Sequence, residues 1–249
     1  MLKMLRADLY KLFKSKILLV LFILMLCSTI IEPLSWMGPQ NLNNYSVYSI
    51  LRSGTALQEF IWLLIVPFAA KDFSSGYVKN FFPSYTKRDK LFYVLSKVAV
   101  IFAFCLLYYL VKFAVNVFFV YIANPEDWMM YDPAENTFTI GYFYFAYIAG
   151  MLNAVAVSSV ITVICMLTKK EILAFLVSLV CIFLSAFVCR MIDNEVGERY
   201  FIEVYTLFAQ YNALYYSSAE QIAVMLGISV FYIVLSVIVG YVILTRRSR

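Results

Sequence analysis

Lys112 is the side chain in this sequence most suited to chemistry inside a membrane, because it lies within the apolar run 97–122. It follows Lys97 by about 22 Å along a helix, and Asn116 lies one turn beyond it on the same face. Burying an ionisable side chain in a bilayer costs at least about 2.5–3.5 kcal/mol, so its presence there indicates a function. Two interpretations are open. Lys112 lines a path for cargo, or its long side chain extends to the outer headgroups.

Three further polar residues are candidates for the same path: Glu32 near the outer end of the first apolar run, Glu59 early in the second, and Asn153 in the fourth. The two glutamates are predicted at a depth similar to that of Lys112, which is compatible with an ion pair between Lys112 and Glu59. The alternative for both glutamates is a position at the membrane surface. Asn153 accompanies a stripe of small residues at four-residue spacing, which predicts close packing of helix backbones.

The polar segment KDFSSGYVKN, residues 71–80, separates two long apolar runs. Gly76 at its centre permits a tight reversal, and the cations Lys87, Arg88 and Lys90 follow it. The whole break, residues 71–90, is longer than a turn requires and mixes aromatic with charged side chains. A continuous helix over 88–123 would be about 50 Å long and would extend out of the bilayer core. The segment therefore predicts a cytosolic docking surface for a soluble partner, and the alternative is an ordinary inner loop that is basic because of membrane topology.

Two features on which many enzymes depend, histidine and a phosphate-binding loop, are absent from the sequence. The chain has no histidine, which removes the commonest metal ligand and the usual general base at neutral pH. It also has no GxxxxGK[ST] sequence to bind nucleotide phosphates. Its five cysteines lie in or at the end of apolar runs, which does not favour a disulfide framework. The chain is therefore predicted to be neither a catalyst nor a metal protein, and any ATP that it uses must be bound by another chain.

The composition is that of an integral membrane protein. Of 249 residues, 63% are hydrophobic and 14% are charged, against about 45–50% and about 25% in soluble proteins. A helix needs roughly 20 apolar residues to cross a bilayer, and six segments qualify: 17–36, 54–70, 97–122, 140–167, 172–189 and 221–244. They are apolar all round, whereas the strands of a barrel would alternate. The sequence predicts one all-α transmembrane domain over residues 1–249, with six spans.

The positions of lysine and arginine predict how these spans are oriented. With both termini in the cytoplasm, the external loops contain only Arg52, Arg190 and Arg199, and the other cations except Lys112 fall in cytosolic segments. The second and third external loops are acidic, which is either ordinary topological bias or an attraction for cationic cargo. Both termini are therefore predicted to be cytoplasmic.

Residues 1–16, MLKMLRADLYKLFKSK, predict an amphipathic helix at the membrane surface. Leucines recur at helical spacing, and lysines and arginine occupy the rest of the wheel, as in interfacial helices on anionic lipids. A signal peptide also starts with a basic segment, but no A-x-A cleavage site follows the apolar run. We expect an uncleaved elbow helix that contacts membrane lipids and leads into the first span.

The last external segment, residues 190–220, is too long and too aromatic for a simple loop. Aromatic side chains favour the membrane–water interface, so short re-entrant or interfacial helices are expected there. Four aromatic residues at helical spacing are candidates for an external gate: Phe201, Tyr205, Phe208 and Tyr215. An aromatic belt without a gating role is the alternative.

The layout of an amphipathic elbow, six spans and a polar segment after the second span resembles ABC-2-type transporter permeases, most of all the permeases of bacteriocin or lantibiotic immunity and peptide export. The stretch that carries the likeness is Phe73-Ser74-Ser75-Gly76-Tyr77-Val78-Lys79-Asn80, followed by Lys87, Arg88 and Lys97. In that family this stretch is a coupling helix that docks on a cytosolic ATPase. The resemblance implies ATPase contacts at Asp72, Phe73, Gly76, Tyr77, Lys79, Asn80 and Arg88. Many relatives have a glutamate shortly before the glycine, where this chain has Asp72 and Ser74.

The resemblance also implies a function and partners. The chain would be a permease subunit in a bacterial plasma membrane, paired with a second copy or a homologue and with a dimer of ATPases that bind ATP and magnesium. Its cargo would be an amphipathic or hydrophobic peptide, and nucleic acid is not an expected partner. The external segment would act as a lid.

Two rival functions predict different features. A secondary transporter that needs no ATPase would carry several deep charges and an inverted repeat, whereas this chain has one deep lysine and no convincing repeat. A membrane scaffold would need an interaction domain, and no loop here exceeds about thirty residues. Transport powered by a separate ATPase is therefore the favoured prediction.

Overall fold

The computed structural model of this chain describes residues 2–36, 65–73, 85–123, 140–196, 202–210 and 218–246, and all of the secondary structure in these ranges is helical. The labelled helices are α1 (Leu2–Lys14), α2 (Lys16–Trp36), α6 (Lys87–Ala123), α7 (Ile140–Thr168), α8 (Glu171–Val196), the 3-10 helix η2 (Glu203–Tyr205) and α10 (Ala219–Arg246). Residues 65–73 are also helical.

Four helices are long and apolar enough to cross a membrane, which confirms an all-α protein of the multi-pass membrane type. These candidate spans are Lys87–Phe118, Tyr144–Thr168, Glu171–Val196 and Ala219–Arg246. The first predicted span, 17–36, coincides with α2, which contains a shorter apolar stretch, Phe22–Ile31. Most of the second predicted span, 54–70, lies outside the described residues. Six spans therefore remain a prediction.

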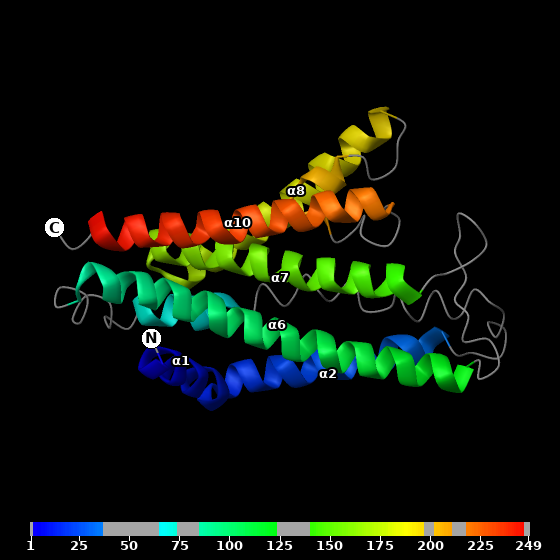
Figure 1. Ribbon diagram of the computed structural model, residues 1–249, viewed down its shortest axis with the longest axis horizontal. Helices are drawn as coiled ribbons and strands as arrows, with labels where there is room; N and C mark the ends of the chain where they lie inside the picture. The colour runs from blue at the N-terminus through cyan, green and yellow to red at the C-terminus, as the bar shows by residue number, and fades with distance from the viewer. Residues whose placement is uncertain are drawn as a thin grey trace.

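Helix α6 lies between the α1–α2 pair on one side and α7 with α10 on the other (Figure 1). Helix α7 is the most enclosed of the four candidate spans, because it packs along α10 and also contacts α6 and α8. Helix α8 diverges from this bundle (Figure 1). The start of α1, the start of α6, the α7–α8 connection and the end of α10 all lie at one end of the bundle.

Local sequence signals explain where the helices begin. Thr86 and Asp89 exchange hydrogen bonds at the start of α6: the Asp89 N–H donates to Thr86 Oγ1 at 3.2 Å, and the Thr86 N–H donates to Asp89 Oδ2 at 3.0 Å. Ser218 and Gln221 do the same at the start of α10, at 3.3 and 2.8 Å. This reciprocal arrangement satisfies N–H groups that the first helical turn leaves without partners.

Two short connections bring neighbouring helices together. Only Lys169 and Lys170 separate α7 from α8, and Lys169 has a φ of 60°, the left-handed conformation that commonly ends a helix. Its N–H donates to the Cys165 carbonyl at 3.1 Å. Ser15 alone separates α1 from α2, so α1 forms an elbow against the first long helix (Figure 1).

Candidate functional site

A group of buried polar side chains lies where α1, helix 65–73 and α6 meet. Asp8 and Lys11 come from α1, Asp72 comes from helix 65–73, and Tyr93, Ser96 and Lys97 come from α6; we call this set the elbow network. Residues three or four positions apart share one face of a helix. That spacing explains why the two members on α1 lie on one side of that helix. It also explains why the three members on α6 lie on one side of theirs.

Lys97 is at the centre of the elbow network, and its side chain is 1% exposed. Its Nζ lies 2.8 Å from Asp8 Oδ1 and 2.7 Å from Asp72 Oδ2. The same Nζ lies 4.5 Å from the centre of the Phe68 ring and 5.3 Å from that of Tyr93, which is within reach of cation–π attraction. One ammonium group therefore holds a carboxylate of α1 and a carboxylate of helix 65–73 against α6.

Asp72 binds a second cation and a hydroxyl. Its Oδ1 lies 2.8 Å from Lys11 Nζ, and its Oδ2 accepts a hydrogen bond from the Tyr93 hydroxyl at 2.9 Å. Burial by itself raises the pKa of this carboxyl, but Lys97 and Lys11 outweigh burial, so the pKa lies below its ordinary value of 3.8. Asp72 is therefore ionised at neutral pH.

The remaining polar atoms of the network also have partners. Asp8 Oδ2 accepts a hydrogen bond from Ser96 Oγ at 3.0 Å, and Ser96 Oγ also lies 2.8 Å from the Tyr93 carbonyl. Two carboxylates face two ammonium groups, so the charges balance. A buried network whose members are all satisfied is rigid. Apart from Lys11 its members are buried, so it is suited to passing a displacement between segments rather than to binding a substrate.

Sequence reasoning singled out Asp72 but missed Asp8 and Lys97 as its companions. A signal was present for Asp8, the only acidic residue among the first 31, since a lone carboxylate in a basic amphipathic helix needs a cationic partner when it is buried. Lys97 was interpreted as a cytosolic cation and as the last residue of the stretch that carries the family likeness, and not as a partner of Asp72. Its partners are separated from it by 89 and 25 positions, and no local pattern reports contacts of that kind.

The residues predicted to contact an ATPase fall into two groups. Asp72 is buried in the elbow network, Phe73 packs against the cluster that contains Tyr93 and Met166, and Arg88 is exposed, with its guanidinium 5.2 Å from the centre of the Phe92 ring. The others lie outside the described residues: Gly76, Tyr77, Lys79 and Asn80.

Lys112 is 0% exposed and lies between α6 and α7. Its Nζ is 5.9 Å from the centre of the Tyr109 ring and 5.6 Å from that of Tyr147. Asn116, one turn away, donates a hydrogen bond to the Tyr147 hydroxyl at 2.6 Å. Lys112 therefore faces the interior of the bundle, while its place in a cargo path stays a prediction. The side chain of Glu32 and the whole of Glu59 lie outside what the structure describes.

Asn153 holds part of the predicted external segment in place. Its Nδ2 donates to the Leu207 carbonyl at 2.9 Å and to Gln210 Oε1 at 2.8 Å. Gln210 in turn donates to the Val204 carbonyl at 2.9 Å. Residues 202–210 are thus bound to α7 by buried hydrogen bonds, and Asn153, predicted to line the cargo path, contributes to that attachment.

Two of the four gate candidates are described. Tyr205 is 55% exposed, whereas Phe208 is partly buried against the main hydrophobic cluster. Phe201 and Tyr215 lie outside the described ranges. Asp193 at the end of α8 accepts the N–H of Ile202 at 2.8 Å, so the segment is anchored to α8 as well as to α7.

No group of three or more His, Cys, Asp or Glu residues in the described ranges is arranged to hold a metal ion. In comparisons with known proteins, no family model matches the chain, and no curated protein matches it significantly.

Proposed function

We propose that this chain is the membrane permease subunit of an ATP-binding cassette exporter. It would move an amphipathic or hydrophobic peptide of the antimicrobial type out of a bacterial cell or out of its plasma membrane. ATP and magnesium would be bound by a separate cytosolic ATPase dimer, and a second permease copy or a homologue would complete the membrane part.

The observation that carries this proposal is the position of Lys97 between Asp8 and Asp72. Asp72 belongs to the polar segment that resembles a coupling helix, so the element that an ATPase would move is bound directly to α6 and to the elbow α1. Helix α6 has 37 residues without a break, about 55 Å at 1.5 Å per residue. A displacement of the coupling segment would be passed along this rod toward Lys112 and Asn116.

Affinity purification from the producing bacterium tests the proposal. The tagged chain, extracted in mild detergent, is expected to recover a P-loop ATPase, and the double variant Gly76→Pro with Lys79→Glu is expected to lose it. The matched control is Lys169→Glu with Lys170→Glu, which removes two exposed cations from the connection between α7 and α8. Recovery of no ATPase by the unaltered chain would reject the exporter, and loss of the ATPase in both variants would reject a specific coupling site.

A second function, an ATP-independent transporter, is favoured by one observation. Lys112 is fully enclosed within a candidate span, and intramembrane charges often belong to ion or proton pathways. Purified protein in vesicles without ATPase would then translocate peptide down an imposed ion gradient, and Lys112→Met would abolish this transport.

A further inference from the structure

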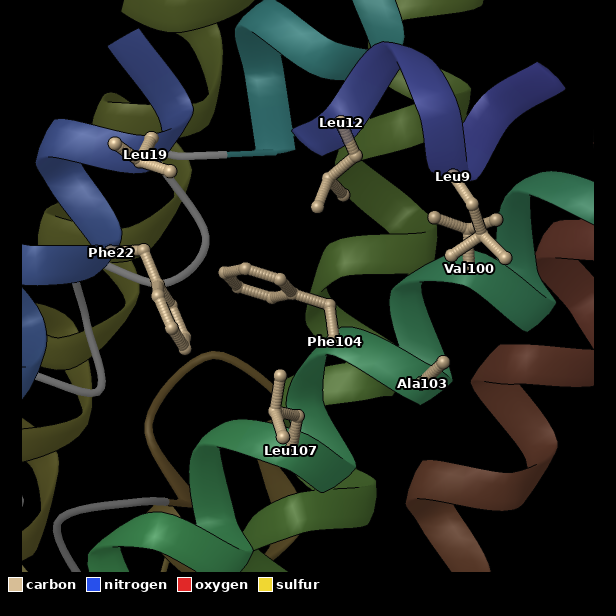
Figure 2. Close-up of a pocket in the computed structure, with 8 residues that line it drawn as sticks. All are labelled: Leu9, Leu12, Leu19, Phe22, Val100, Ala103, Phe104 and Leu107. Carbon is tan, nitrogen blue, oxygen red and sulfur yellow. The ribbon is translucent and has the colours of Figure 1, made fainter. Parts of the chain in front are cut away.

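An apolar cavity of about 210 Å³ lies between the elbow helix α1, the first turns of α2 and the middle of α6. Figure 2 shows Leu9 and Leu12 of α1, Leu19 and Phe22 of α2, and Phe104 and Leu107 of α6 around it. Every residue that lines it is apolar. Because apolar cavities of this kind exclude water, an occupant must itself be apolar.

The size and openness of this elbow cavity favour a slender occupant that enters from the side. Its volume is below the range of about 300–1,000 Å³ typical of sites for drug-sized ligands, so it suits a single hydrocarbon chain. Leu19 and Leu107, on opposite walls, are 50% and 43% exposed. The cavity is therefore accessible from the surface that these helices present to the bilayer.

The charges that the structure describes as exposed on α1 and at the start of α2 are of one sign. Arg6, Lys14 and Lys16 are exposed at the elbow, whereas Asp8, the only carboxylate of α1, is buried and neutralised by Lys97. Lys16 precedes Leu19 by three residues and so lies on the same face of α2, one turn closer to the elbow. An apolar site with a cation at one end matches an anionic lipid. The cavity suits the acyl chain, and the cation suits the negatively charged headgroup.

We propose that the elbow cavity binds one acyl chain of an anionic phospholipid, whose headgroup phosphate contacts Lys16. The lipid fills the space between α1 and α6 next to the elbow network and so stabilises the elbow against the long helix. This site does not depend on the proposed exporter function, because it uses neither the coupling segment nor Lys112.

Native mass spectrometry of the purified chain, incubated with equal amounts of phosphatidylglycerol and phosphatidylcholine, tests the proposal. The unaltered chain is expected to retain one phosphatidylglycerol in preference to phosphatidylcholine. Replacing Lys16 by Gln is expected to lower this preference by about fivefold, because one cation near an anionic lipid contributes about 1 kcal/mol. Equal retention of the two lipids by the unaltered chain would overturn the anionic assignment.

Filling the cavity separates an acyl-chain site from general adhesion of lipid. Ala103→Trp places an indole in the space, and Leu110→Trp adds the same group to an exposed position of α6 outside it. The first variant is expected to lose the retained phosphatidylglycerol and the second to keep it. If Ala103→Trp does not fold, Leu19→Trp narrows the cavity from its exposed wall and is expected to show the same loss. Retention of the lipid by a folded cavity variant would overturn the proposal.

Discussion

Lys97 can lie in the protein interior because Asp8, Asp72 and two aromatic rings replace the water that an ammonium group otherwise needs. A buried ion pair is not in itself a large source of stability, since removing two charges from water offsets most of their attraction. Removing one partner is costly, because the remaining charges stay buried without compensation. Lys97 therefore contributes strongly to the attachment of α1 and helix 65–73 to α6, together with the hydrogen bonds of Ser96 to Asp8 and of Tyr93 to Asp72.

Lys97→Met is expected to destabilise the protein by about 3–5 kcal/mol, the usual cost of leaving a buried charge unpaired. Thermal unfolding in detergent measures the effect, and limited proteolysis at Lys3 or Arg6 should show α1 released first. Lys87→Met is the matched control, because Lys87 is an exposed lysine on the same helix and its loss should change little.

The double variant Asp8→Asn with Lys97→Met distinguishes charge from packing. It removes one charge of each sign and keeps the pair of Lys11 with Asp72, so it should be more stable than Lys97→Met alone. Equal instability of the single and double variants would show that the lysine acts through packing and not through its charge.

Asp72 gives the elbow network a dependence on pH. Its pKa in the folded protein lies below 3.8, so its contribution to stability is fully present above pH 3.8 and is lost as the pH falls through the lower, folded value. Hydrogen exchange of α1 should therefore stay constant from pH 8 to pH 5 after correction for intrinsic rates. It should rise only in acid below pH 3.8, and a rise near neutral pH would contradict this assignment.

Helix α6 shows which elements can be predicted from sequence and which contacts cannot. The helix was predicted over 88–123 and is observed over Lys87–Ala123. These bounds follow from a threonine–aspartate cap at the start and a long apolar run after it. The contacts of Lys97 with Asp8 and of Asn153 with Leu207 join residues 89 and 54 positions apart. Such pairs depend on how the helices pack, which a single sequence does not encode in any local pattern.

Close packing near the end of α10 predicts that a larger side chain at Gly240 destabilises the protein. A Cβ at Gly240 would lie 3.2 Å from Val94 Cγ1 and 3.4 Å from Met166 Sδ, whereas one at Gly227 would meet nothing within 4 Å. Gly240→Leu should thus force α10 away from α6 and α7 and cost about 1–3 kcal/mol. Gly227→Leu, the control, should be neutral or slightly stabilising through helix propensity, and thermal unfolding compares the two. Equal melting temperatures would show that α10 does not approach its neighbours this closely.

At the scale of the whole molecule, the distribution of charges and the arrangement of helices agree on one polarity. The elbow between α1 and α2, the start of α6, the α7–α8 connection and the end of α10 lie at the same end of the bundle (Figure 1), and the sequence of each contains lysine or arginine. The positive-inside rule predicts that this end faces the cytoplasm.

Cysteine labelling in intact cells tests this polarity. In a background without the five native cysteines, Lys169→Cys and Ser218→Cys place single thiols at exposed positions on opposite ends of the bundle. A maleimide that cannot cross membranes should label Ser218→Cys from outside, and should label Lys169→Cys only after the cells are permeabilised. The reverse labelling pattern would show that the protein has the opposite orientation in the membrane. The coupling segment and the elbow cavity would then face away from the cytoplasm, and an ATPase could not reach residues 71–90.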